Sequence, residues 1–165
     1  MSGAEIIKPP NSLKNAKSGS GPGKLDNELL ERAEKAVQKM EVSYNEWVKD
    51  DLDEIEMVLK DLIAADGKDN ALIKQLYRVV FDTKGQGGSF GYPLLTQVAG
   101  SLADFLNDKK ELNQFGLEVA TAHVSSMRAV IKENIRDDGG ATGVALVESL
   151  QTLVAKARAE ESDVA

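Results

Sequence analysis

Apolar residues recur every three or four positions through most of this chain, and no segment alternates with a period of two. Such spacing places the apolar side chains on one face of an α-helix, whereas a half-buried β-strand needs strict alternation. The connections between successive apolar stripes are short, which favours neighbouring helices that run in opposite directions. We therefore expect an all-α protein that folds as an antiparallel helical bundle.

The stripes also predict the first helices. One helical segment should follow Asp26, a plausible N-cap, and a second should end near Gly67, where glycine suits a left-handed C-cap. The sequence leaves open whether these two segments form one long helix or break between residues 41 and 43. A third helix should follow Asp69. Its core-facing stripe is expected to contain Leu72, Ile73, Leu76, Val79, Val80, Thr83 and Gly87.

Proline and glycine mark the remaining helices. Pro93 fits the first turn of a helix but not its interior, so a fourth helix should begin there. A fifth should run from about Glu111 to Arg136 and close at Gly139-Gly140. A sixth should follow, with apolar residues between Val144 and Ala157.

The two ends of the chain differ from the rest in composition. Residues 1–24 are rich in glycine, proline, serine and lysine, and such a segment cannot bury enough apolar surface to offset its chain entropy. Within it, residues 6–13 are more apolar than a linker needs, so they either dock onto a surface or belong to an inert tail. We expect a disordered tail over 1–24, a helical bundle over 25–160 and a frayed C-terminus over 161–165.

Composition and charge exclude several classes of function. The formal net charge of -7 argues against a protein that mainly holds nucleic acid, because phosphate binding calls for a basic surface. The chain has no cysteine and one histidine, so neither thiol chemistry nor a conventional metal site is expected. No run of apolar residues is long enough to insert into a membrane. We expect a cytoplasmic protein that needs no cofactor.

The third helix should carry a polar and glycine-rich face opposite its apolar stripe. Plotted at 100° per residue, this outward face contains Lys74, Tyr77, Arg78, Phe81, Lys84, Gly85 and Gly88. Glycine in a helix costs roughly 0.5–1 kcal/mol relative to alanine, and three glycines stand within four residues here. A role other than helix stability must therefore explain them.

The segment Phe81-Asp82-Thr83-Lys84-Gly85-Gln86-Gly87-Gly88 resembles the phosphotransfer motif of histidine phosphotransfer (HPt) domains. In that family a helix carries a pattern close to His-x-x-Lys-Gly, followed by small residues. Lys84, Gly85, Gly87 and the turn glycine Gly91 fit the pattern, and Phe81 stands where the family has its phosphoacceptor histidine. The resemblance covers roughly residues 26–136 and implies a four-helix HPt-like core with extra helices.

The resemblance implies a binding module rather than an enzyme. Phenylalanine has no nucleophilic atom, so position 81 cannot carry a phosphoryl group. A degenerate HPt domain would dock a response-regulator receiver domain or a histidine kinase of bacterial-type two-component signalling without accepting phosphate. The resemblance places partner binding on the outward face of the third helix, at Tyr77, Arg78, Phe81, Lys84, Gly85 and Gly88.

Two alternatives remain from the sequence. The only histidine, His123, lies among apolar residues of the fifth helix, where it is a half-buried packing residue, part of a partner surface or a relocated phosphoacceptor. If it were a phosphoacceptor, the protein would be an active phosphorelay intermediate. Alternatively, the motif is coincidental, and the chain is a helical structural protein or homodimer that buries Phe81 against a second copy.

The carboxylate-rich segment 50–56 is interpreted as a solvated helix face.

Overall fold

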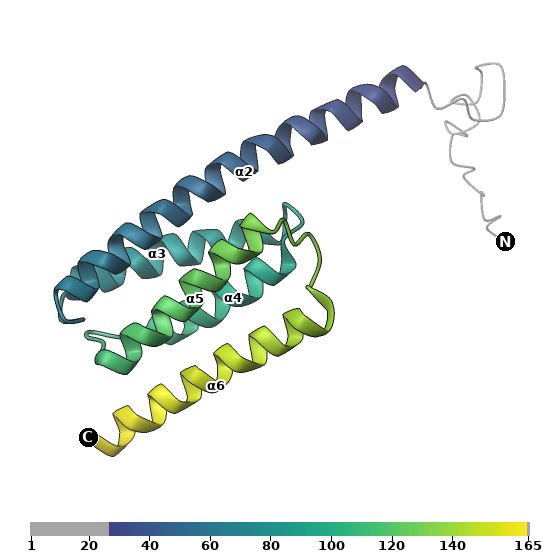
Figure 1. The fold of residues 1–165 in the computed structure, drawn as a ribbon. Helices are drawn as coiled ribbons and strands as arrows, with labels where there is room; N and C mark the ends of the chain where they lie inside the picture. The colour runs from purple at the N-terminus through teal and green to yellow at the C-terminus, as the bar shows by residue number, and fades with distance from the viewer. Residues whose placement is uncertain (1–26, 165) are drawn as a thin grey trace, which may run out of the picture. The chain divides into compact units, whose positions relative to one another are not determined.

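The computed structural model of the protein describes residues 27–164. Figure 1 shows that this part of the chain consists of helices joined by short loops, and no strand occurs within it. The all-α expectation is therefore confirmed. The helices are α2 (Asn27–Ala64), α3 (Asn70–Gly87), α4 (Pro93–Leu106), α5 (Gln114–Lys132) and α6 (Gly140–Val164). The tail expected over 1–24 lies outside the described residues.

The two segments that the sequence left unjoined form a single helix, α2. No glycine or proline occurs between its ends, so nothing in the local sequence interrupts the backbone hydrogen bonds. The chain divides into two compact units, residues 1–38 and 39–165, and the boundary falls within α2. In the first unit, residues 27–38 are helical and exposed along their whole length.

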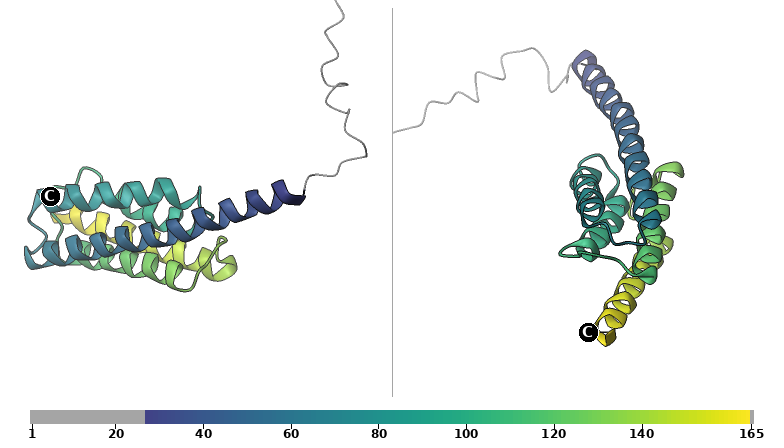
Figure 2. Two further views of the ribbon diagram at one scale, coloured as in Figure 1. Left: turned by 90° about the horizontal axis from the view of Figure 1, so that it is seen from above. Right: turned by 90° about the vertical axis from the view of Figure 1, so that its left-hand side faces the viewer.

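The second unit is the helical bundle. From Lys39 onward α2, α3, α4, α5 and α6 follow one another in alternating directions, as two further views also show (Figure 2). Helix α4 is central, because it contacts α3, α5 and α6, and nine of its 14 residues are buried. The apolar stripe of α2 joins the same core through Tyr44, Val48, Leu52, Ile55, Val58, Leu59 and Leu62.

A tight turn joins α3 to α4 where the sequence predicted a break. Gly91 has a positive φ of 82°, which glycine adopts without strain, and Pro93 occupies the first turn of α4. Between them, the buried Tyr92 places its hydroxyl 2.9 Å from Asn45 Oδ1 and 2.7 Å from Asn134 Oδ1. The turn is thereby tied to α2 and to the end of α5.

Two helix ends differ from the prediction. Helix α5 begins at Gln114 rather than near Glu111, because the side chain of Asn113 caps it by accepting a hydrogen bond from the Gly116 amide at 2.7 Å. It ends at Lys132 rather than at Arg136, since Asn134 has a positive φ of 50°.

The C-terminus was expected to fray over 161–165; α6 is helical as far as Val164, and Ala165 lies outside the described residues. An ion pair between Lys109, in the loop before α5, and Glu161 attaches this last turn to the bundle. The contact joins residues 52 positions apart, so no local pattern in the sequence indicated it.

Candidate functional site

The two faces of α3 lie where the helical spacing predicted them. Ile73, Leu76, Val79, Val80, Thr83 and Gly87 are buried. On the opposite face Lys74, Arg78, Gly85 and Gly88 are exposed, and 49% of Phe81 is accessible to solvent. An exposed phenylalanine therefore stands on a helix whose other face is anchored in the core.

Phe81 lies between an aromatic ring and a cation. The Tyr77 ring is centred 5.7 Å from that of Phe81 at an interplanar angle of 30°. On the next turn, Lys84 places its Nζ 5.8 Å from the Phe81 ring centroid, within the range of a cation–π contact. Tyr77 and Lys84 thus flank the Phe81 ring without burying it.

The glycines after Phe81 have different surroundings. Among the described residues, a Cβ atom at Gly85 would meet nothing within 4 Å, and one at Gly88 would meet only Thr96 Oγ1, at 3.6 Å. A Cβ atom at Gly87 would instead approach Thr96 Oγ1 to 2.7 Å and the Tyr92 carbonyl oxygen to 3.3 Å. Gly85 and Gly88 thus keep the surface beside Phe81 free of side chains, whereas Gly87 allows α4 to pack closely against α3.

The Lys84 side chain extends from this face toward α4. A Cβ atom at Gly100 would lie 3.5 Å from Lys84 Cε and 3.9 Å from its Nζ, so the lysine stem follows the bare backbone of α4. The Thr96 hydroxyl donates a hydrogen bond of 3.2 Å to the Lys84 carbonyl oxygen. Within residues 27–164 the Lys84 ammonium group makes no ion pair, which leaves its charge available to a ligand or a partner.

His123 is completely buried, rather than half-buried as the packing interpretation expected. Its Nδ1 lies 2.8 Å from the Val119 carbonyl oxygen, and its Nε2 lies 3.0 Å from Ser101 Oγ on α4. Burial lowers the pKa of His123, and the contact with the Val119 carbonyl opposes this effect in part. Both ring nitrogens are occupied, so neither is presented to an incoming phosphoryl group.

Sequence reasoning missed Ser101 as the partner of His123. The two residues are 22 positions apart and lie on different helices, so no helical spacing connects them. A buried histidine needs a partner for each ring nitrogen, and that requirement was the only available signal. It indicates that a partner exists without saying which residue supplies it.

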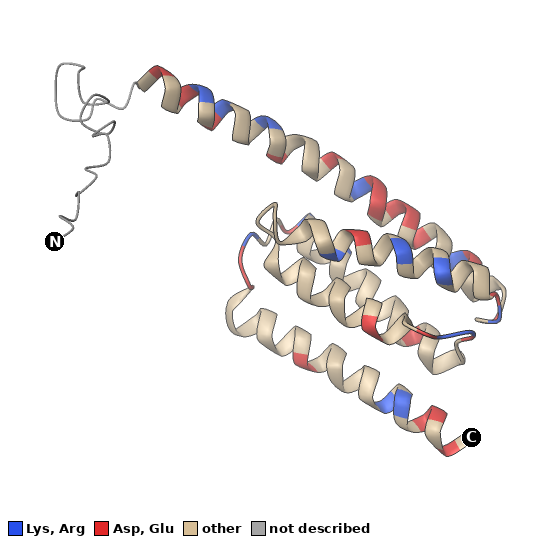
Figure 3. Ribbon diagram, turned by 180° about the vertical axis from the view of Figure 1, so that it is seen from behind, with Lys and Arg blue, Asp and Glu red and all other residues tan. Residues whose placement is uncertain are grey.

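The carboxylates at 50–56 form the acidic part of α2 seen in Figure 3. Arg128 of α5 crosses to this face, with its Nη2 2.6 Å from Asp53 Oδ1 and its Nε 2.8 Å from Glu56 Oε1. Partial burial, followed by repulsion from neighbouring carboxylates, raises the pKa of Asp51. Across residues 27–164, no group of three or more acidic or histidine side chains is arranged to hold a metal ion.

Comparison with models of protein families, with curated proteins and with solved structures finds no match. Among the helices of the described region, none is both long enough and apolar enough to cross a membrane.

Proposed function

We propose that this protein is a non-catalytic docking module of two-component phosphorelay signalling. Its binding surface, the α3 face, consists of Tyr77, Arg78, Phe81, Lys84, Gly85 and Gly88. This face would bind a response-regulator receiver domain, or a histidine kinase, without accepting phosphate.

The exposure of Phe81 carries this proposal. Phe81 is a large apolar residue, yet 49% of it is accessible to solvent. Its ring lies between the Tyr77 ring and the Lys84 ammonium group. Aromatic side chains that a partner can desolvate dominate the binding energy of protein interfaces. The open surface at Gly85 lets a partner approach that ring closely. The motif resemblance adds the class of partner, because the corresponding surface of HPt domains is the one that receiver domains contact.

The two alternatives gain less support from the geometry. Phosphotransfer through His123 would require the bundle to open, since its ring is buried and both nitrogens are hydrogen-bonded. A homodimer that buries Phe81 predicts a chain that elutes as a dimer, and its Phe81→Asp variant should elute as a monomer. Size-exclusion chromatography with light scattering distinguishes this arrangement from a monomer that binds a different protein.

The binding experiment compares two exposed aromatic residues. Phe81→Asp should reduce the affinity for purified receiver domains of the same organism at least tenfold, measured by biolayer interferometry, while the melting temperature changes little. Trp47→Asp is the matched control, because Trp47 is 59% exposed on α2, outside the α3 face, and should bind like the wild type. If both variants bind equally well, or if neither a receiver domain nor a histidine kinase of that organism binds, the proposal is wrong.

A gain-of-function variant tests whether the site retains the remainder of the phosphotransfer motif. Phe81→His introduces a nucleophilic imidazole on the exposed turn next to Lys84. After incubation with a phosphorylated receiver domain, we expect acid-labile phosphate on this variant and none on the wild type. Lys84→Met in the same background should reduce the yield, because it removes the cation beside the phosphoryl oxygens. Phosphate on the wild-type chain would contradict the non-catalytic assignment.

A further inference from the structure

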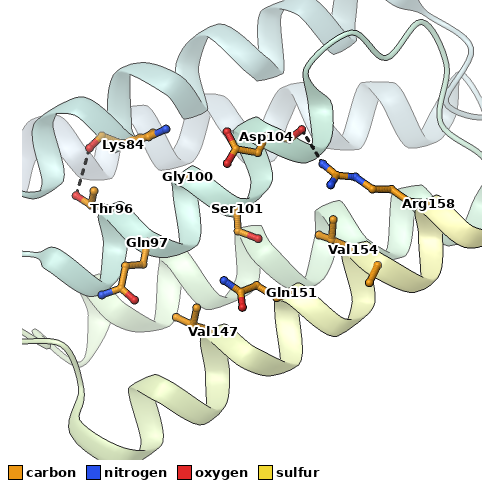
Figure 4. Close-up of a pocket in the computed structure, with 11 residues that line it drawn as sticks. Lys84, Thr96, Gln97, Gly100, Ser101, Asp104, Val147, Gln151, Val154 and Arg158 are labelled. Atoms are coloured by element: carbon orange, nitrogen blue, oxygen red, sulfur yellow. Dashed lines mark hydrogen bonds between the residues drawn. The ribbon is translucent and has the colours of Figure 1, made fainter.

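A cleft of about 450 Å³ lies between side chains of α4 and α6, with Lys84 of α3 at one side. Figure 4 shows that its polar side chains come from three helices, α3, α4 and α6. The cleft shares only Lys84 with the α3 face.

Three charged groups lie along one edge of the cleft in the order Lys84, Asp104, Arg158 (Figure 4). Arg158 is positioned by a hydrogen bond of 3.1 Å from its Nη2 to the backbone oxygen of Asp104. Neither the two cations nor the Asp104 carboxylate forms an ion pair with any residue from 27 to 164. The cleft therefore presents a positive, a negative and a positive charge in a row, and none of the three forms an ion pair within the described residues.

The hydrogen bonds beneath the cleft fix the polarity of Ser101. The Val119 carbonyl oxygen can only accept, so the proton of His123 lies on Nδ1 and its Nε2 is bare. Ser101 must then donate its hydroxyl hydrogen to Nε2, at 3.0 Å. Toward the cleft, Ser101 Oγ consequently offers only lone pairs. A ligand must supply a hydrogen-bond donor at this point.

The positions on α4 that the two cationic side chains contact indicate the size of the ligand. The Lys84 stem lies beside Gly100, and Arg158 contacts Asp104 four residues later on the same helix. Four residues of an α-helix correspond to a rise of about 6 Å. Two anionic groups on a chain of four or five carbons can span a separation of this order.

We propose that the cleft binds an acidic α-amino acid. Its two carboxylates pair with Lys84 and Arg158, and its ammonium group donates to the Asp104 carboxylate and to Ser101 Oγ. The ligand then carries two negative charges and one positive charge, opposite at each point to those of the cleft. This site is a separate proposal from the docking of a receiver domain, although both use Lys84.

The probe is L-glutamate, added to the isotopically labelled full chain and followed by amide NMR. We expect the resonances of Gly100, Ser101, Asp104 and Arg158 to shift together along one saturable curve. Glutarate lacks the ammonium group and glutamine lacks the second carboxylate, so each should bind at least tenfold more weakly. Inorganic phosphate, which needs only the cations, should also bind more weakly. Equal binding of glutarate or phosphate would overturn the assignment and indicate a general anion site.

Variants outside the α3 face separate this proposal from the docking function. Arg158→Gln should weaken glutamate binding at least tenfold, whereas Lys156→Gln, an exposed cation of α6 outside the cleft, should leave it unchanged. Asp104→Asn should remove the preference for glutamate over glutarate. Both Asp104 and Arg158 are exposed, so circular dichroism should show these variants folded. If no cleft resonance titrates, or if all variants bind like the wild type, the site does not exist.

Discussion

At the scale of single residues, the structure separates two glycines that the sequence presents as equivalent. Gly85 and Gly87 stand two positions apart on α3, and both cost helix stability relative to alanine. A side chain at Gly85 would project into open space, whereas one at Gly87 would press on Thr96 and on the Tyr92 carbonyl. The first glycine keeps a surface open, and the second maintains the distance between two helices.

We predict opposite effects of alanine at the two positions. Gly85→Ala should raise the free energy of unfolding by about 0.5–1 kcal/mol, because it restores helix propensity without a clash. Gly87→Ala should lower it by about 1–3 kcal/mol, since Thr96 and the backbone of Tyr92 must shift to make room. Urea unfolding of the two variants beside the wild type measures both effects. Equal effects would contradict the packing role of Gly87.

His123 should make stability depend on pH. Its pKa is lowered in the folded protein by burial, so the unfolded chain takes up the proton first as the pH falls below about 6.5. The contribution of neutral His123 to the free energy of unfolding is complete above that pH. It is lost as the pH falls toward the pKa of His123 in the folded protein. The urea midpoint should therefore be lower at pH 5.5 than at pH 7.5.

His123→Gln isolates this contribution, because the chain has no other histidine. The raised pKa of Asp51 acts in the opposite sense, since the folded state then binds its proton more readily than the unfolded state at low pH. Asp51 is present in both proteins, so the difference between them reports His123 alone. An identical pH dependence in the variant would contradict the buried neutral histidine.

At the scale of helices, burial is distributed unevenly. Nine of the 14 residues of α4 are buried, whereas α6 buries four of 25: Gly143, Leu150, Val154 and Ala157. Residues 27–38 of α2 include none that is buried, and their apolar side chains Leu29, Leu30 and Val37 are 60%, 41% and 54% exposed. Short helical segments without tertiary packing are marginal in water.

This difference predicts the order of amide hydrogen exchange. Amides of α4 should exchange slowest, at a rate set by global unfolding, because they lie in the centre of the core. Amides of α6 should exchange faster, and those of residues 27–38 fastest among the described helices. Exchange followed by mass spectrometry at neutral pH resolves the three classes. Strong protection over residues 27–38 would show that this part of α2 is covered in solution.

At the scale of the whole molecule, the hydrophobic core belongs to the second unit. The first buried side chain of α2 is Tyr44, after the boundary at Lys39. We predict that a chain beginning at Lys39 unfolds cooperatively, with a melting temperature within a few degrees of that of the full chain. Thermal melts followed by circular dichroism test this prediction. Loss of the cooperative transition would mean that residues 1–38 contribute to the core.

Much of the fold could be predicted from helical spacing alone. The buried stripe of α3, from Ile73 to Gly87, and the break before Pro93 follow from the local sequence. The ends of α5 and α6 could not be predicted in the same way. The start of α5 depends on the Asn113 side-chain cap, which apolar spacing does not reveal, and the last turn of α6 is attached by the ion pair between Lys109 and Glu161, 52 positions apart.

The sequence by itself determined that the protein is helical and that Phe81 points away from the core, because helical geometry fixes the direction of each side chain about its own axis. Only the tertiary structure decided what those side chains meet. It joined His123 to Ser101, set α4 against Gly87, and brought Lys84 and Arg158 to the same cleft. These contacts depend on how distant segments pack, which no local spacing encodes. The helix around position 81 could thus be predicted from the sequence, whereas the cleft beside it could not.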